Sequence, residues 1–205
     1  TTHAYINSSG NVGIGTTSPD ARLHVDSATA FSLTDGSADT LLLTNDSNTS
    51  AVGAIGPSIG FGNMNTNRRT SAIGAIRTGG DHDNMGLAFF THPSDTGNET
   101  IVQQMTIAHD GKVGIGTTSP TRDLQIGDGS SDSVLTIVAP TTGLSQIGLG
   151  DTDDDNRMQI IADHNLDLFS IQTGGGTGLN SGKDRLVINS SGNVGIGTTS
   201  PAVKL

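Results

Sequence analysis

Oxygen-bearing side chains that could bind a metal ion are densest between residues 151 and 156. The run reads Asp-Thr-Asp-Asp-Asp-Asn and places the carboxylates of Asp151, Asp153 and Asp155 at alternate positions. A calcium loop uses this spacing because the ion takes several oxygen ligands from one short segment. The glycine and the terminal bidentate glutamate of a helix-loop-helix calcium site are missing. We therefore expect a solvated acidic turn here, with these three aspartates as the calcium candidates, and we expect no cofactor.

Histidine-containing segments are the remaining candidates for acid–base chemistry or metal binding. They are Asp81-His82-Asp83 and Asp163-His164, while His109 occupies a turn position. Histidine and aspartate are also common in loops, and no second ligand cluster stands at a helpful spacing. The chain lacks the Gly-x-Ser-x-Gly segment that presents a serine nucleophile. We therefore expect no catalytic residue and no enzymatic activity.

One ten-residue sequence occurs three times along the chain. Gly-Asn-Val-Gly-Ile-Gly-Thr-Thr-Ser-Pro occupies residues 10–19 and 192–201, and residues 111–120 differ from it only at Lys112. Gly-x-Gly could open a nucleotide-binding loop, but the third glycine of that fingerprint, the Gly-Lys-Ser/Thr ending of a phosphate loop and a following amphipathic helix are absent. Internal repetition is instead typical of a repeat architecture. We interpret the repeat as structural.

Each copy predicts a β-hairpin. The segments 7–10, 108–111 and 189–192 end in glycine, which suits a type I turn closed by a left-handed glycine. Strand alternation places Ile6, Val12 and Ile14 on one face of the first hairpin. The equivalent residues of the other two copies share a face of their own hairpins. A short strand over residues 21–25 is expected after the proline, because proline ends the preceding strand.

The opposite face of the second hairpin strand carries only glycine. These structural repeat glycines are Gly13, Gly15, Gly114, Gly116, Gly195 and Gly197. Glycine weakens a strand, so its recurrence indicates that another backbone or side chain comes close. We expect Gly13, Gly114 and Gly195 to leave room for a strand of a neighbouring chain.

Composition limits the size of any core and the kinds of partner. Hydrophobic residues make up 32% of the chain and aromatic residues 3%, so few large side chains are present to build a core. The formal net charge is −10 and the basic residues are scattered, which argues against nucleic acid and membrane partners. No run of apolar residues is long enough to predict membrane insertion. Cysteine is absent, so disulfides cannot stabilise small modules.

The order of the chain predicts hairpin collars alternating with β-rich modules. We expect repeat hairpin units at residues 1–25, 105–126 and 186–205, and insert modules at 26–104 and 127–185. Strand candidates in the first insert lie around Phe31 and Leu33 and at residues 41–43, 54–56, 58–62, 72–76 and 86–90; those in the second lie at residues 133–138, 145–149, 157–161 and 167–171. Residues 99–107 could hold a helical turn or two. The first residue is not methionine, and we expect a window of a longer repetitive chain.

The second insert repeats the pattern of apolar segments found in the first insert. Phe61 in Ile-Gly-Phe-Gly corresponds to Leu149 in Ile-Gly-Leu-Gly, and residues 87–91 correspond to residues 166–170. Gly13 to Gly114 is 101 residues and Gly114 to Gly195 is 81 residues, so the inserts differ in length. Loops that change length while strands persist lie on a surface.

A single repeat unit has too few apolar side chains to offset the entropy lost on ordering it. Burial between copies of the chain solves this problem, and closed rotational symmetry would turn the same face of every copy inward. The predicted inter-chain core consists of Val12, Ile14, Val113, Ile115, Val194 and Ile196.

Residues 185–205, with the insert segments Ile-Gly-Phe-Gly and Leu-Ala-Phe-Phe-Thr, resemble repeat regions of bacteriophage tail fibres and tailspikes. Such repeats commonly precede a C-terminal intramolecular chaperone domain of the endosialidase type. The resemblance implies an all-β, intertwined, parallel homotrimeric fibre located on the virion.

The resemblance also implies a structural shaft or adhesion segment that presents a receptor-binding tip to a host. The partners would be further copies of the chain and a glycan or protein receptor on the host surface. Two alternatives stay open: a bacterial surface adhesin or extracellular filament subunit, and a glycan-degrading tailspike that works with paired carboxylates.

Overall fold

The computed structural model describes residues 4–27, 39–44, 51–62, 69–93, 100–153, 157–174 and 183–203. Within these ranges every regular element is a β-strand, which confirms the predicted all-β class. No helix in the described part is long and apolar enough to cross a membrane. The chain divides into two compact units, Thr1–Ser133 and Val134–Leu205.

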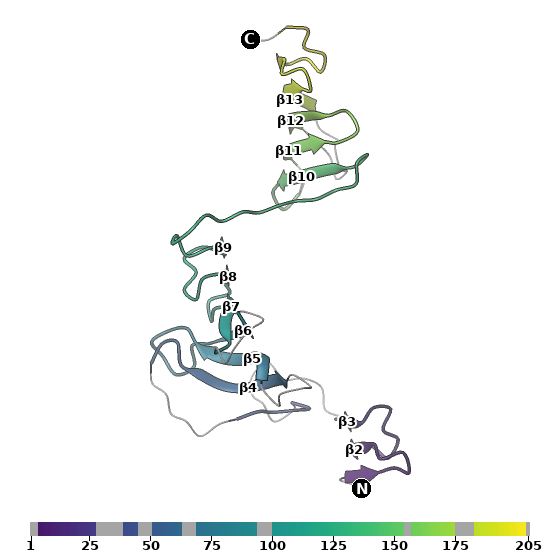
Figure 1. Ribbon diagram of the computed structural model, residues 1–205, viewed down its shortest axis with the longest axis vertical. Helices are drawn as coiled ribbons and strands as arrows, with labels where there is room; N and C mark the ends of the chain where they lie inside the picture. Colours follow the sequence, from purple (N-terminus) through teal and green to yellow (C-terminus); the bar gives the residue numbers. More distant parts are fainter. Residues whose placement is uncertain are drawn as a thin grey trace. The chain divides into compact units, whose positions relative to one another are not determined.

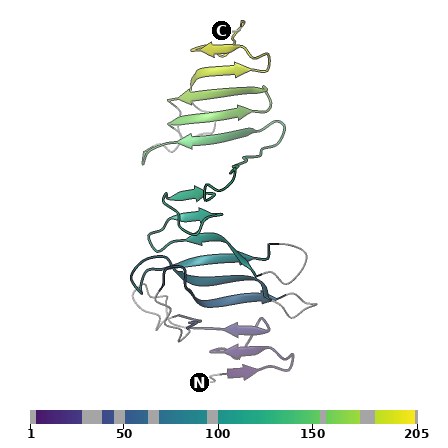
Figure 2. The same cartoon turned by 60° about the vertical axis from the view of Figure 1, so that its left-hand side comes forward.

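Three sheets hold the strands (Figures 1 and 2). The first sheet contains β1 (Ala4–Ile6), β2 (Val12–Ile14) and β3 (Leu23–Val25). The second contains β4 (Ile55–Gly62), β5 (Arg69–Arg77), β6 (Met85–Thr91), β7 (Val102–Ile107), β8 (Val113–Ile115) and β9 (Leu124–Ile126). The third contains β10 (Leu144–Leu149), β11 (Met158–Asp163), β12 (Leu168–Thr173), β13 (Lys183–Asn189) and β14 (Val194–Ile196).

Strand order in every sheet follows the order of the chain. Neighbours pair antiparallel, as in a meander, except that β2 pairs with β3 and β8 with β9 in parallel. Parallel neighbours usually need a crossover of a dozen residues or more. Here the Gly-Thr-Thr-Ser-Pro segment and three further residues make the crossover, which we call the crossing loop (residues 15–22 and 116–123).

The second and third sheets are built on the same register. Ile59, Ile73, Phe89, Met105 and Ile115 are successive cross-strand partners, and so are Ile147, Ile160, Ile171, Leu186 and Ile196. Phe61 therefore corresponds to Leu149, as predicted. Leu87 corresponds to Phe169, so the predicted match of residues 87–91 to 166–170 is wrong by three positions. The reason is that residues 166 and 167 lie in the turn before β12 and are not part of the strand.

A β-bulge recurs at the same place in both sheets. The register shifts after Phe89 in the second sheet and after Ile171 in the third. As a result, Gln104 has no partner on β6 and Arg185 has no partner on β12. The backbone carbonyls of these bulge residues accept the N–H groups of Gly116 (2.9 Å) and Gly197 (3.0 Å). The bulge thus ties the end of the hairpin to the start of the crossing loop.

One face of each large sheet is buried, but the two buried faces differ in polarity. Ala72, Ile76, Ala88 and Phe90 form an apolar cluster in the second sheet. In the third sheet the buried positions include Gln159, Asp163, Ser170 and Gln172, beside Ile161 and Val187. Burial of polar groups requires hydrogen bonds: Gln172 Nε2 donates to Asp184 Oδ1 at 2.9 Å, and Asp163 Oδ1 accepts the N–H groups of Asn165 and Leu166.

The opposite face, which we call the open face, carries two rows of apolar side chains. One row is the ladder of cross-strand partners that begins at Ile59 or Ile147, and in the first sheet it consists of Ala4, Ile14 and Val25. The other row includes Leu87, Ile107 and Val113 in the second sheet. Several of these side chains are about half exposed, such as Ile59 at 48% and Ile147 at 44%. The predicted inter-chain core residues all lie in these rows.

Several local predictions are wrong. Residues 133–138 form no strand and expose Val134, Leu135 and Val138; residues 41–43 are likewise exposed coil. A β-rich composition does not fix a strand when no neighbour pairs with it. Residues 102–107 are strand β7 rather than a helical turn, because β6 and β8 supply hydrogen-bonding partners on both sides. Phe31, Leu33 and Leu205 lie outside the described residues.

The insert boundaries fall in places that the sequence did not indicate. The expected boundary between residues 104 and 105 lies inside β7, and the one between 185 and 186 lies inside β13. Each large sheet therefore includes the hairpin that follows it. Along the chain, the first compact unit ends at Ser133 and the second begins at Val134.

Candidate functional site

The hairpin turn of the repeat forms as its residue types predict. Gly10, Gly111 and Gly192 all have positive φ, and each donates its N–H to the carbonyl three residues earlier at 2.8–3.0 Å. In the first copy the Asn7 Oδ1 accepts the N–H groups of Ser9 and Asn11, both at 3.0 Å. The side chain of a turn asparagine thus supplies hydrogen bonds that the strands cannot.

The crossing loop folds back over the glycine at the centre of the second hairpin strand. A Cβ atom at Gly13 would lie 2.4 Å from the carbonyl oxygen of Thr16. The same atom would be 2.6 Å from Thr117 O at Gly114, and 2.7 Å from Thr198 O at Gly195. The predicted close approach is real, but the expectation that these glycines leave room for a neighbouring chain is wrong, because the chain's own loop fills that space.

The strand itself is shorter than predicted. Gly15, Gly116 and Gly197 lie just past the strands and have positive φ of 78°, 71° and 71°. Glycine adopts this conformation without the steric cost that other residues incur. These glycines therefore turn the chain into the crossing loop rather than forming a strand face.

Asparagine side chains tie the turn to the crossing loop in the first and third copies. Asn11 Nδ2 donates to Pro19 O at 3.4 Å. Asn193 Nδ2 and Asn189 Nδ2 donate to Pro201 O at 3.2 and 3.4 Å. In the second copy Ala108 and Lys112 occupy the two asparagine positions. Neither side chain provides an amide donor for Pro120 O, so this link is missing there.

A cavity of about 530 Å³ lies at the position of the missing link. Its walls come from the end of β5 (Ile76, Arg77), from Val52 and Gly53, from the turn at residues 108–110 and from the crossing loop at residues 118–121. Gln103 of β7 also contributes. All of these elements belong to the second sheet or border it. This volume falls in the range of ordinary small-molecule sites.

Arg77 brings a buried positive charge to the cavity wall. Its side chain is 5% exposed; Nε donates to Gly79 O at 3.1 Å and Nη2 donates to Gly80 O. Nη1 is buried and has no hydrogen-bond partner. Among the described residues no carboxylate lies within ion-pair distance of this guanidinium. The charge is therefore held by neutral carbonyl groups only.

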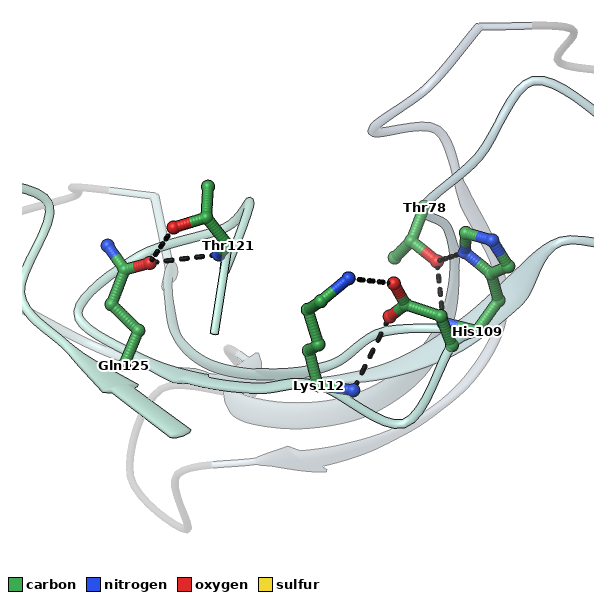
Figure 3. Close-up of polar contacts among 6 residues, drawn as sticks. Thr78, His109, Lys112, Thr121 and Gln125 are labelled. Atoms are coloured by element: carbon green, nitrogen blue, oxygen red, sulfur yellow. Dashed lines mark hydrogen bonds and ion pairs between the residues drawn. The ribbon is translucent and has the colours of Figure 1, made fainter. Parts of the chain in front are cut away.

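His109 and Thr78 connect the turn to the end of β5, as Figure 3 shows. The hydroxyl of Thr78 lies 2.9 Å from His109 Nδ1 and also accepts the His109 N–H at 2.9 Å. A Cβ atom at Gly79 would lie 2.8 Å from His109 Cε1, so the ring packs closely on the segment that binds Arg77. His109, which the sequence placed in a turn without further role, thus helps to form a wall of the cavity.

Figure 3 also draws two further polar pairs, and one member of each, Asp110 or Thr121, lines the cavity. Lys112 Nζ pairs with Asp110 Oδ2, and the Lys112 hydrogen bonds lower the pKa of the Asp110 carboxyl from its ordinary value. Asp110 is therefore an ionised carboxylate that already has a counter-ion. Thr121 donates both its N–H and its hydroxyl to Gln125 Oε1, at 2.9 and 3.2 Å, which fixes the end of the crossing loop.

The calcium candidates do not assemble into a metal site in the described residues. Asp151 pairs with Arg157 at 3.3 Å and accepts the N–H of Asp153 at 3.1 Å, so it caps an exposed turn. Asp155 lies outside the described residues. In the part of the chain that the structure covers, no three His, Asp or Glu side chains gather closely enough to hold a metal ion.

The histidine-containing candidates serve turns and lie apart from one another along the chain. Asp81 Oδ1 accepts the N–H of Asp83 at 3.1 Å in an exposed turn. Asp163 caps the turn after β11, as described above, and the adjacent His164 Nε2 lies 2.9 Å from the hydroxyl of Ser145. That hydroxyl also donates to Ile137 O at 2.9 Å. These contacts give Asp81, Asp163 and His164 local structural roles.

The cavity was not predicted, although the sequence carried a signal for it. Residues 108 and 112 are where the second copy departs from the asparagines of the other two. The contribution of Arg77 had no such signal, because it depends on how the chain turns at residues 79 and 80.

Fold and site together define a class: an all-β chain of sequential meanders, each large sheet ending in the repeat hairpin, with a cavity at the second copy. Models of protein families gave no match, and neither did the curated proteins. Among solved structures, the carboxy-terminal domain of the L-shaped tail fibre of bacteriophage T5 is 12% identical, and the alignment covers 87% of this chain and 92% of that one. Its TM-score is 0.33, at which the likeness carries no conclusion about this chain.

Proposed function

We propose that this chain is a structural segment of a phage tail fibre or similar virion appendage, in which copies of the chain pack as a parallel homotrimer. The open face is the observation that supports self-association. Its rows of apolar side chains continue across every strand of the two large sheets, from Ile59 to Ile126 and from Ile147 to Ile196. Contiguous exposed apolar surface on this scale marks an interaction site.

A second copy of the chain is the partner that best suits this face. The rows recur in all three sheets at equivalent repeat positions, so a symmetric assembly would bury each of them against its own equivalent. Ile171 is 37% exposed, so burying the remaining surface contributes roughly a third of the value for full burial, about 0.5–1 kcal/mol for each such side chain. The net charge of −10 disfavours association through polar contacts between identical surfaces, which makes the apolar rows the favoured contact.

Location on a virion and presentation of a host-binding tip rest on the resemblance of the repeats to phage tail fibres. Closed three-fold symmetry rests on the same resemblance. Under this proposal the segment acts mechanically and carries out no reaction.

Analytical ultracentrifugation tests the assembly. A trimer has three times the 20.8 kDa mass of the chain. Phe89→Asn and Ile171→Asn, at equivalent positions of the open face, should weaken association by at least about tenfold, since each buries a polar group in the contact. Arg122→Ser, at an exposed position in the crossing loop, is the matched control and should leave association unchanged. A wild-type chain that is folded and monomeric at micromolar concentration would contradict the proposal.

Immunogold labelling tests the location. Antibodies raised against the chain should label the tails of virions. Labelling of uninfected bacterial surfaces instead would favour the adhesin or filament alternative.

A further inference from the structure

The cavity at the second repeat copy lies where the sequence of that copy departs from the other two. The first and third copies close this position with asparagine amides bound to the carbonyls of Pro19 and Pro201. Ala108 and Lys112 remove both amides from the second copy, and the cavity lies there. The same hairpin and the start of the same crossing loop therefore exist with and without the asparagine link.

The charge in the wall indicates the sign of a ligand. Arg77 is 5% exposed, its Nη1 is buried without a hydrogen-bond partner, and no carboxylate among the described residues lies within ion-pair distance of its guanidinium. A buried charge without a counter-ion is costly, and an oxyanion near the guanidinium would remove that cost. Asp110 is the acidic group on the cavity wall, and its ion pair with Lys112 neutralises it.

The remaining wall indicates the rest of the ligand. Thr118, Ser119, Thr121 and Gln103 offer hydroxyl and amide groups, which donate and accept hydrogen bonds. Val52, Ile76, Ala108 and Pro120 supply an apolar part of the wall, and no Phe, Tyr or Trp among the described residues lines the cavity. A ligand that carries hydroxyl groups and apolar C–H faces beside an anionic group, as a sugar derivative does, matches this mixed lining.

We propose that this cavity binds a small polyhydroxylated oxyanion, a sugar acid or a sugar phosphate, with Arg77 as the counter-ion and the crossing-loop hydroxyls as hydrogen-bonding partners. Ala108, which lines the cavity, and Lys112, which pairs with the lining residue Asp110, stand where the other copies have the linking asparagines, and we assign the specificity of the site to this exchange. The proposal is independent of the assembly state and of the location on a virion.

Isothermal titration calorimetry on the full chain tests the site, with glucuronate, glucose 1-phosphate and glucose as probes. We expect saturable binding of at least one of the two anions, with a Kd of about 1 mM, and at least about tenfold weaker binding of glucose. Comparison of the two anions identifies which oxyanion the site prefers. Failure of both anions to bind to folded protein would overturn the proposal.

Converting the second copy to the sequence of the others is the decisive variant. Ala108→Asn/Lys112→Asn restores the amides that reach the proline carbonyl, and should abolish anion binding while the circular dichroism spectrum is retained. Ala108→Asn alone separates closure of the cavity from loss of the Lys112 charge, and should also weaken binding at least about tenfold if closure is the cause.

Two further variants complete the design. Asn7→Ala/Asn11→Lys makes the reverse exchange in the first copy, none of whose residues lines the cavity, and should leave anion binding unchanged. Arg77→Gln should abolish binding of both anions in protein that retains its fold. Anion binding that survives both Ala108→Asn/Lys112→Asn and Arg77→Gln would show that the ligand binds elsewhere and would overturn the assignment.

Discussion

Replacing Gly114 by alanine is expected to destabilise the second sheet through a contact within one chain. The added Cβ would lie 2.6 Å from the carbonyl oxygen of Thr117, which is 0.4 Å inside the 3.0 Å that real Cβ contacts respect. The neighbour is backbone, so the crossing loop must move. Overpacking of this kind costs about 1–3 kcal/mol, which for a chain of this length lowers Tm by roughly 2–10 °C.

Two other glycines separate the causes of such a loss. Gly80 has open space around it and no positive φ, so Gly80→Ala should be neutral or slightly stabilising, by up to about 1 kcal/mol, because it restricts the unfolded chain. Gly111 also has open space but a φ of 85°, so Gly111→Ala should cost only the left-handed backbone strain, about 1–2 kcal/mol. The contact at Gly114 is thus tested apart from both backbone effects.

The equivalent glycines extend the test to a series. A Cβ atom would approach the loop carbonyl to 2.4 Å at Gly13 and to 2.7 Å at Gly195, so the local loss should decrease from Gly13 to Gly114 to Gly195.

The assay is thermal unfolding at two protein concentrations tenfold apart, with hydrogen exchange to locate the loss. A contact within the chain predicts that the difference between wild type and Gly114→Ala does not change with concentration. Stability of Gly114→Ala equal to that of Gly80→Ala would refute the reasoning. A difference that appears only as weakened association would restore the interpretation that another chain packs on this glycine.

Three shorter predictions concern the turns and the absence of chemistry. Lys112→Asn should raise the pKa of Asp110 toward its ordinary value of 3.8, as carbon-13 NMR titration can show; since Lys112 lowers the folded-state pKa, its stabilising effect is present above pH 3.8 and lost as the pH falls through the lowered value. Asn7→Ala should cost about 1 kcal/mol in the first sheet, because Oδ1 accepts two N–H groups, and hydrogen exchange over residues 4–25 can detect this. The chain should not depolymerise host capsule or lipopolysaccharide; turnover that Asp163→Asn abolishes would contradict this.

The sequence predicted those parts of the fold that depend on local chemistry. The turn at residues 7–10 could be predicted because left-handed glycine and a side-chain acceptor act within four residues. The faces of Val12 and Ile14 followed from strand alternation. The parallel pairing of β2 with β3 could not be predicted, since alternation gives the faces of a strand but not the direction of its neighbour.

The candidate site depends on contacts that residue types do not encode. Arg77 follows an apolar strand, and only the turn of the chain brings Gly79 O and Gly80 O to its guanidinium. The run at residues 133–138 shows the reverse case, in which a strand-like composition finds no pairing partner.

Sequential strand order has a consequence for how such a chain can change in evolution. In the described part of the chain each strand pairs only with its neighbours in sequence. A cut between two of these strands therefore removes whole hairpins and does not separate a strand from its pairing partner elsewhere in the sheet. The repeated decapeptide supplies equivalent joining points. A recombination that joined Val12 to Gly114 would delete 101 residues and still keep an intact turn, crossing loop and parallel strand. Segments of this kind can be lengthened, shortened or exchanged unit by unit, while the register of the remaining sheets is preserved.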